Sequence, residues 1–538
     1  MEDNDLYRYG RSQPEVESTI RRAGYFERRP ESVFMGFAYG KPLYGNQDAG
    51  FYLQAGSRAG KLTDIVAYTV CEGIYANTAI IIDPKFELAE ISRSQITHRK
   101  FCIYWNPTGY GPFPQNRINP VDFIRLDSPS LVSDTKLFCQ NILPLSGSPQ
   151  AEFFEIKGQL LLEAVILTIV ELDGELTLGR LFSIVNLIAG NGDAWRAFSF
   201  EMHESRFAVA RAVEEEIAAG RNDSGGTMRS ILAEATKALA PLSDPQLLES
   251  VSPPFDMSMA DLCGSQPYHV YLMPPAEFME SWAPVIKALY VAAFIYKRRC
   301  GTHSIPQLWA LEECSLLKGF PIVSMIFSLG ATYGIRALAI YQTHDQAKAT
   351  GPDAESIIPA SAGVSWQFGI RDTPSAERLE RRLGKQSLHF DDALRQREAS
   401  LARTRALYDA IDGGDPIEAG LKAAHYQFAS EHRSLQPRSL QTVPEILGMP
   451  RDRMWIFADR LEHPIYATRA PFYEQRFMAG RYHPTRFHPP YDRVRVKTLF
   501  GHAWRRVIEE PVPPEFAHLP QYAGGTWTRI EKRKWWQI

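Results

Sequence analysis

The chain has 538 residues, of which 45% are hydrophobic and 12% aromatic. This content is enough for two or three domains with large buried cores, and it excludes a disordered protein. The 59 Lys and Arg residues nearly balance the 62 Asp and Glu residues, and a net charge of −3 excludes a uniformly basic nucleic-acid-binding surface. The six cysteines are scattered without C-x-x-C pairs, which argues against a zinc site and a disulfide framework.

Residues 1–35 are polar and charged, and we expect a surface arm or a short helix there. No run approaches the ~18 apolar residues that a membrane-spanning helix needs. The best candidate, Leu160 to Leu172, carries Glu163 and Glu171. The chain starts with an acidic stretch, whereas a secretory signal starts with a basic one. The sequence therefore predicts a soluble, cytoplasmic protein.

The next segment, residues 36–140, is predicted to be the first half of a nucleotide-binding α/β domain. Within it, Ala55 to Thr63 reads A-G-S-R-A-G-K-L-T after an apolar run. A phosphate-binding loop needs glycines, whose backbone N–H groups converge on phosphate oxygens, and a lysine that reaches the β- and γ-phosphates. The residues predicted to bind the nucleotide are Gly56, Ser57, Arg58, Ala59, Gly60, Lys61, Leu62 and Thr63.

Three positions depart from the consensus loop G-x-x-x-x-G-K-[ST]. Ala55 stands where the consensus has Gly, and Leu62 stands where it has Ser or Thr. Thr63 is one place late for the magnesium contact. About twenty residues further on, Ala79 to Ile82 is a β-branched run typical of a strand buried on both faces, and Asp83-Pro84-Lys85 follows it.

Residues 141–250 have helical periodicity without strand patterns, which predicts an all-α domain. Four helices are expected, over residues 151–172, 178–189, 204–219 and 228–239. Thr177 and Thr227 are the expected N-caps of the second and fourth. A helical lid on an α/β domain is the simpler alternative, and spacing does not separate the two.

The second half of the α/β domain is expected over residues 251–465. Gln307 to Leu311 is a buried-strand pattern, and Glu312 and Glu313 follow it, as in the magnesium-and-water site of an ATPase. A further strand, Ile335 to Tyr341, ends at Gln342. Because the carboxyl ends of parallel strands meet at one edge of a sheet, these acids and Gln342 predict one nucleotide site with the loop at Lys61.

A charged helix over residues 391–412 predicts an insertion near 389–430, which we interpret as solvated in preference to a DNA contact. A late strand is expected at 454–457. In the tail, residues 466–538, basic residues outnumber acidic ones and alternate with aromatic residues and prolines. Such a tail can bind single strands by stacking or dock on a protein. The prolines favour an extended, protein-docking tail.

Taken together, these motifs resemble the type IV coupling proteins, the ATPase family that feeds DNA or protein substrates into conjugation and type IV secretion channels. The matching stretches are residues 56–61, 82–85, 119–124, 269–272 with Pro275, 311–313 with Gly319, 333–336, Gln342 and 368–372. They occur in the family's order. Glu312 departs from the family, because the first of the two acids is normally Asp.

The resemblance implies an α/β fold, namely a RecA/FtsK-like P-loop NTPase core with an inserted all-α domain at the substrate-entry face. It also implies ATP and Mg²⁺ as cofactors. Lys61 would neutralise the β/γ-phosphates, while Glu312 and Thr63 would hold the metal. Glu313 would activate the attacking water. Further implied roles are Gln342 as γ-phosphate sensor, and Arg336 or Arg371 as an arginine finger of a neighbouring subunit.

As for partners, the resemblance implies a homo-hexamer that takes single-stranded DNA, a secreted protein substrate, or both. Relaxase-type or adaptor proteins and components of a type IV secretion channel are the expected partners. Type IV coupling proteins usually begin with two membrane-spanning helices, whereas the family-like region here starts almost at once. The expected location is therefore the inner face of the bacterial inner membrane through an anchoring partner, unless an anchor has been removed.

The sequence leaves two other interpretations of the function open. Ala55, Leu62 and Glu312 favour a degenerate, non-hydrolysing scaffold that recruits substrates. A soluble FtsK/HerA-like DNA motor is the second alternative, against which the helical insertion argues.

Overall fold

The computed structural model describes residues 10–72, 77–93, 100–190, 192–220, 226–351, 353–390, 393–411, 415–431 and 434–531. The chain divides into two compact units. The smaller consists of Met1–Val16, Ile370–Pro450 and Glu462–Ile465. The larger consists of Glu17–Gly369, Arg451–Leu461 and Tyr466–Ile538.

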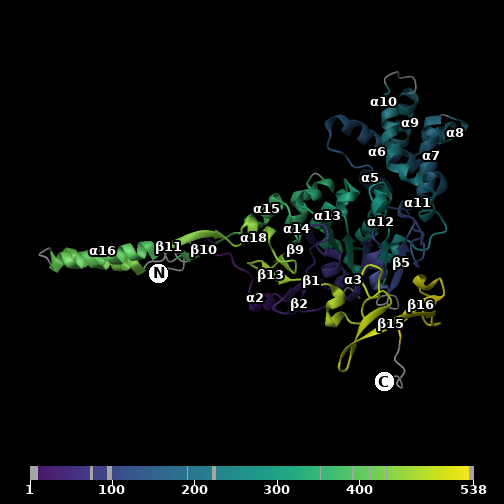
Figure 1. Ribbon diagram of the computed structural model, residues 1–538. Helices are drawn as coiled ribbons and strands as arrows, with labels where there is room; N and C mark the ends of the chain where they lie inside the picture. Colours follow the sequence, from purple (N-terminus) through teal and green to yellow (C-terminus); the bar gives the residue numbers. More distant parts are fainter. Residues whose placement is uncertain are drawn as a thin grey trace. The chain divides into compact units, whose positions relative to one another are not determined.

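An eleven-stranded sheet is the centre of the described fold, in the order β2-β1-β13-β12-β9-β3-β8-β7-β4-β6-β5 (Figure 1). The strands are β1 Val33–Ala38, β2 Lys41–Gly45, β3 Phe51–Ala55, β4 Thr78–Ile82, β5 Phe101–Trp105, β6 Tyr268–Leu272, β7 Gln307–Leu311, β8 Ile335–Tyr341, β9 Val364–Phe368, β12 Arg453–Ala458 and β13 Ile465–Thr468. From β9 to β5 all neighbours are parallel. β12 pairs antiparallel with β9, and β1 with β13 and β2.

Both faces of the parallel strands are covered, which explains their continuous apolar runs. One face, with Tyr52, Ile80 and Trp309, shares a core with helices α5 (Leu131–Ile142), α12 (Ala283–Cys300), α13 (Pro321–Tyr333) and α14 (Ala354–Ser361). The short helices α3 (Ala67–Glu72) and α4 (Glu87–Ser92) follow β3 and β4. On α3, Tyr68 stacks on Phe34 of β1 with ring centroids 4.0 Å apart.

Helices fill the span between α5 and β6. They are α6 Pro149–Asp173, α7 Leu178–Gly190, α8 Asp193–Glu204, α9 Ala208–Gly220, α10 Thr227–Leu239 and α11 Pro245–Ser250. Thr177 caps α7 as expected, because its hydroxyl accepts a hydrogen bond from the backbone N–H of Arg180 (3.3 Å). Thr227 is the first residue of α10, whose N-cap is Gly226. The expected helix over 204–219 corresponds to α9, which begins only at Ala208, because Glu204 is the last residue of α8.

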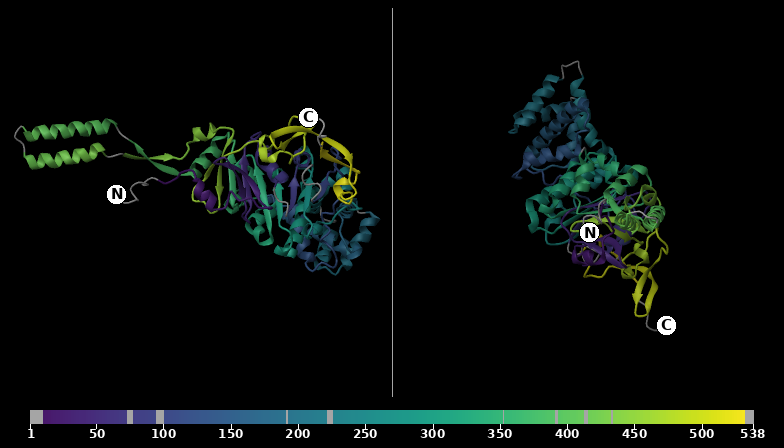
Figure 2. Two further views of the ribbon diagram at one scale, coloured as in Figure 1. Left: turned by 90° about the horizontal axis from the view of Figure 1, so that it is seen from below. Right: turned by 90° about the vertical axis from the view of Figure 1, so that its left-hand side faces the viewer.

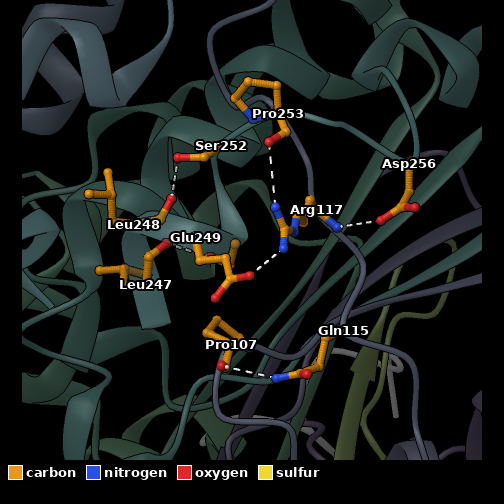
Figure 3. A network of polar contacts seen from close by, with 10 residues as sticks. Pro107, Gln115, Arg117, Leu247, Leu248, Glu249, Ser252, Pro253 and Asp256 are labelled. Carbon is orange, nitrogen blue, oxygen red and sulfur yellow. Dashed lines mark hydrogen bonds and ion pairs between the residues drawn. The ribbon is translucent and has the colours of Figure 1, made fainter. Parts of the chain in front are cut away.

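Arg117, in the loop after β5, ties this helical segment to the sheet (Figure 3). Its guanidinium donates to the Glu249 carboxylate of α11 and to the carbonyl of Pro253. Its backbone N–H donates to Asp256 Oδ2 (2.7 Å). The helical segment is therefore held at its end as well as at α5, where it begins.

Within the smaller unit, α15 (Thr373–Leu383) and α18 (Val443–Leu447) flank a long excursion. A two-stranded ribbon, β10 (Lys385–Phe390) with β11 (Ser434–Ser439), leads to an antiparallel helix pair (Figure 2). The pair consists of α16 (Ala393–Ile411) and α17 (Pro416–Glu431). The predicted charged helix corresponds to α16, whereas the ribbon and α17 were not predicted.

The C-terminal segment differs from the expected extended tail. Residues 493–530 contain a three-stranded antiparallel sheet of β14 (Arg493–Thr498), β15 (Gly501–Pro511) and β16 (Thr526–Ile530). The β-branched and aromatic residues between the prolines explain the strands. At the other end, the predicted arm contains one described short helix, α2 (Glu17–Arg22). No described helix combines the length and hydropathy that crossing a lipid bilayer requires.

Candidate nucleotide site

Four parallel strands, in the order β3-β8-β7-β4, end at one edge of the sheet. The loop 56–60 follows β3, and Gln342 follows β8. Glu312 and Glu313 follow β7, and Asp83-Pro84-Lys85 follows β4. The fold thus brings the predicted loop, the paired acids and Gln342 to a single edge.

Two glycines give the loop after β3 its shape. A Cβ at Gly56 would lie 2.3 Å from the carbonyl oxygen of Gly369, so only glycine fits there. Gly60 has a φ of +85°, in the left-handed region that favours glycine. Helical structure begins at Lys61, and residues Leu62–Val66 form a π-helix before α3. Single turns of π-helix are frequent at functional sites.

Two lysines face two glutamates at this edge. Lys85 Nζ lies 3.5 Å from Glu312 Oε1 and 3.9 Å from Glu313 Oε1. Burial lowers the pKa of Lys61, while the charges of Glu313 and Glu312 oppose that shift. The charges of Glu312 and Glu313 therefore act on Lys61 as well as on Lys85. Cationic groups at the end of the loop provide the positive charge that a polyphosphate requires.

Glu313 is held by Gln342, whose Nε2 lies 3.3 Å and 3.2 Å from the two carboxylate oxygens of Glu313. Glu313 has a φ of +52°, a conformation that is uncommon for residues other than glycine. Backbone strain of this kind is concentrated at functional sites. The two residues expected to meet at the γ-phosphate are therefore in direct contact.

Glu312 is only 5% exposed, and burial raises its pKa to about 7. Its Oε2 has no hydrogen-bond partner among the described residues. Burial likewise raises the pKa of neighbouring Asp83 to about 8. An unpartnered, buried carboxylate oxygen is costly unless a water or an ion occupies the position beside it.

These residues fit magnesium held mainly through water. Leu62, where the consensus has a hydroxyl, contributes to an apolar lining with Ile82 and Ala310 beside Glu312. It offers the metal no ligand. Since Mg²⁺ keeps several waters and takes one or two carboxylates plus substrate phosphates, the free oxygen of Glu312 suits such a site.

Comparison with known families agrees with this geometry. Residues 11–410 match the family described as type IV secretory system conjugative DNA transfer. The chain belongs to this family. It is thus a type IV coupling protein, as the ordered motifs predicted, and the FtsK/HerA-like alternative is set aside.

Solved structures agree on the fold. The bacterial conjugative coupling protein TrwBdeltaN70, in its unbound monoclinic form, is 14% identical with a TM-score of 0.59, and the match covers 86% of this chain and 93% of that one. The plasmid coupling protein TrwB with ADP and Mg²⁺ is 15% identical, with a TM-score of 0.57 and coverages of 86% and 94%. No curated relative matches the chain. The predicted α/β, RecA-like P-loop NTPase fold is confirmed.

The two arginines expected to act as fingers lie elsewhere in this coupling protein. Arg336 is the second residue of β8, six residues before Gln342, so it belongs to the opposite edge of the sheet, ~20 Å away at ~3.3 Å per residue. It is buried, and its guanidinium donates to the carbonyl of Glu31 (2.6 Å). This interior position does not fit a finger that reaches into a neighbouring subunit. Arg371 is exposed, three residues beyond β9, and belongs to the smaller unit.

Three residues at the loop and its edge were missed as site residues. Lys85 was recognised only as part of a family motif, although its place after a buried strand was a usable signal. Asp64 and Arg469 form a buried ion pair beside Gly60. Arg469 had been counted with the basic tail. Nothing in the local sequence connects these two residues.

The burial of Glu312 leads us to predict that its contribution to the free energy of unfolding depends on pH. Glu312 has a folded-state pKa raised above its usual 4.5, so the folded chain binds its proton more tightly than the unfolded chain. The resulting stabilisation is present below pH 4.5 and is lost as pH rises through 7. Glu312→Gln should therefore be more stable than wild type at pH 8, by about 1–3 kcal/mol, and similar at pH 5.

Urea unfolding at the two pH values measures this difference. The matched control is Glu201→Gln, which changes an exposed glutamate of α8. An equal pH dependence in wild type and Glu312→Gln would show that Glu312 stays ionised.

Proposed function

We propose that this coupling protein binds and hydrolyses ATP at the carboxyl edge of β3, β8, β7 and β4. The observation that carries the proposal is the contact of Glu313 with Gln342 beside Lys85, on the edge where the loop at Lys61 ends. Phosphoryl transfer needs three kinds of group in one place. Glu313 would activate the attacking water, Gln342 would sense the γ-phosphate, and Lys61 and Lys85 would bind the phosphates.

In this mechanism the loop's backbone N–H groups and Lys61 bind the β- and γ-phosphates. Glu313 accepts a proton from the attacking water, and Gln342 fixes the orientation of its carboxylate. Glu312 and the hydroxyl of Thr63 are the groups that would hold magnesium, Glu312 through water. Bound magnesium would neutralise charge on the phosphate oxygens.

Hydrolysis would drive DNA, a secreted protein, or both into a conjugation or type IV secretion channel. The family's description as conjugative DNA transfer supports DNA as a substrate, and we propose that it is single-stranded. Relaxase-type or adaptor proteins and channel components are the proposed partners. A membrane-anchoring partner would place the chain at the inner face of the bacterial inner membrane.

A homo-hexameric ring is the proposed active form. Phosphoryl transfer in ring motors is often completed by an arginine supplied in trans, which requires a heterologous, closing interface. Arg371 is the exposed candidate for that role. TrwB structures with ADP and Mg²⁺ and with the ATP analogue ADPNP support nucleotide binding by this fold.

A non-hydrolysing scaffold is the second candidate function. Leu62 favours it, because an apolar side chain occupies the position of the consensus magnesium ligand. Such a chain would bind nucleotide or substrates without turnover.

Lys61→Ala tests the proposal. Charge-assisted hydrogen bonds to phosphate contribute ~1.5–3 kcal/mol, so we expect ATP affinity to fall by ~2 kcal/mol or more, roughly 30-fold. Isothermal titration calorimetry measures the affinity, and ATP turnover is followed with and without single-stranded DNA.

The control is Lys237→Ala, which removes a lysine of α10 whose side chain is 71% exposed. Equal ATP binding by wild type and Lys61→Ala would make the loop a structural turn and would sink the proposed function.

A further inference from the structure

Arg469 directly follows β13, and its side chain is buried against the loop 56–60, the proposed phosphate-binding loop. Its guanidinium donates to the carbonyl oxygen of Ala59 and to the carboxylate of Asp64. Only 6% of its side chain is exposed, and 8% of that of Asp64. The guanidinium carbon lies 4.3 Å from the ring centroid of Phe368, the last residue of β9. One side chain therefore joins the loop, the helix after it and a neighbouring strand.

The contact with Ala59 fixes the direction of a loop N–H group. In a trans peptide the C=O and the following N–H point opposite ways. Holding the carbonyl of Ala59 on Arg469 therefore turns the N–H of Gly60 away from Arg469. Backbone N–H groups of this loop are the groups that bind phosphate oxygens. The orientation of the Ala59–Gly60 peptide thus depends on Arg469.

Asp64 links the same arginine to Thr63. The hydroxyl of Thr63 lies 2.7 Å from Asp64 Oδ1 and 3.3 Å from the carbonyl oxygen of Gly60. A hydroxyl has one proton, and the shorter bond to a carboxylate is the stronger one. Because the hydroxyl of Thr63 donates its hydrogen bond to Asp64, the lone pairs of its oxygen stay available for another ligand.

Stability alone does not account for this ion pair. Burial raises the pKa of Asp64 and lowers that of Arg469, so each charge is costly to bury by itself. Replacing a buried ion pair by apolar side chains of similar volume is often neutral or stabilising. What the pair provides, and apolar groups would not, is directed hydrogen bonds to Ala59 and Thr63.

The segment after Arg469 is itself fixed to the helix behind the loop. The hydroxyl of Tyr68, on α3, donates to the carbonyl of Ala470 (2.8 Å). The ring of Phe477 lies 5.7 Å from that of Tyr68 and 6.5 Å from that of Phe34. Arg469 is therefore presented to the loop by a segment with its own anchor, which does not depend on the ion pair.

We propose that Arg469 is a positioning residue for nucleotide binding. Through Ala59 and Asp64 it holds the loop in its phosphate-binding conformation without touching the nucleotide. The inference rests on the proposed function of the loop. It assigns control of nucleotide affinity to the segment that enters the C-terminal part of the chain, which the sequence had indicated only as a docking tail.

The decisive variant is the double substitution Asp64→Leu with Arg469→Met. It removes the directed hydrogen bonds while keeping an apolar, filled site, so we expect a melting temperature close to that of wild type. ADP and ATP affinities, measured by calorimetry with and without Mg²⁺, should fall 10-fold or more, as for loss of residues that orient a ligand-binding group. Arg469→Lys should restore part of the affinity that Arg469→Ala loses, because an ammonium can bond one of the two acceptors.

Arg298→Met is the matched control. Arg298, on α12, also pairs with a buried aspartate, Asp134 of α5, but this pair does not contact the loop. It should lower the melting temperature and leave nucleotide affinity unchanged. A double variant that binds ADP as wild type does, while Lys61→Ala does not, would overturn this inference and leave the proposed function standing. If wild type binds no nucleotide, the proposed function fails first.

Discussion

Glu313→Gln should bind ATP as wild type does and hydrolyse it ~10²-fold more slowly or worse. Glutamine keeps the shape of the side chain and its hydrogen bonding, but it lacks the basic oxygen that takes the proton of the attacking water. The contact with Gln342 explains why the effect should be large, since it holds the carboxylate of Glu313 in one orientation. Phosphate release under saturating ATP measures the rate, and calorimetry the affinity.

The control for this variant is Glu280→Gln, which changes a glutamate whose side chain is 59% exposed. A variant that hydrolyses ATP at the wild-type rate would remove Glu313 from the chemistry. If wild type itself binds nucleotide but shows no turnover with DNA, partners and magnesium, the scaffold replaces the motor. Leu62 would then mark a lost metal site.

The buried parallel strands could be predicted closely from the sequence. The expected Gln307 to Leu311 and Ile335 to Tyr341 are the observed bounds of β7 and β8. Strands covered on both faces read as continuous apolar runs, and the polar residue that follows each run marks where it leaves the core. The placement of the candidate residues Glu313 and Gln342 just beyond strand ends is predictable for the same reason.

The burial of Arg336 could not be predicted from its place in the sequence. A parallel strand has a direction, and Arg336 stands at the start of a run whose end carries Gln342, ~20 Å away over six extended residues. That separation by itself is compatible with a role in the site of a neighbouring subunit. What argues against a finger is the contact of its buried guanidinium with the carbonyl of Glu31, which is 305 residues away and which no local pattern identifies.

Arg469 and Asp64 could not be predicted together. They are 405 residues apart, and neither has a local pattern that identifies its partner. Within the basic segment after residue 465, Arg469 looks like any other arginine of a solvated or docking surface. It reaches the loop only through the sheet order β13-β12-β9-β3, in which β12 pairs antiparallel with β9. Contacts of this range depend on topology, which composition does not encode.

Asp134→Ala should destabilise the larger unit by about 3 kcal/mol, which is more than a hundredfold in the unfolding equilibrium. Asp134, on α5, is 1% exposed and accepts hydrogen bonds from Arg298, Arg299 and Ser130. Removing it leaves two arginines of α12 without their carboxylate. Breaking a buried pair costs ~3–5 kcal/mol, and the lower value applies because both arginines partly reach water.

Urea unfolding followed by circular dichroism measures the loss, and hydrogen exchange in α5 and α12 locates it. Asp127→Ala is the control, because that side chain is 79% exposed. A loss below about 1 kcal/mol, the usual value for surface ion pairs, would mean that the arginines find other partners. Since α5 precedes α6, a loosened α5 should also weaken one of the two attachments of the helical segment, leaving the contacts of Arg117 at its other end. If that segment receives substrate, Asp134→Ala should reduce DNA-stimulated turnover while leaving ATP affinity, which depends on the loop at Lys61, unchanged.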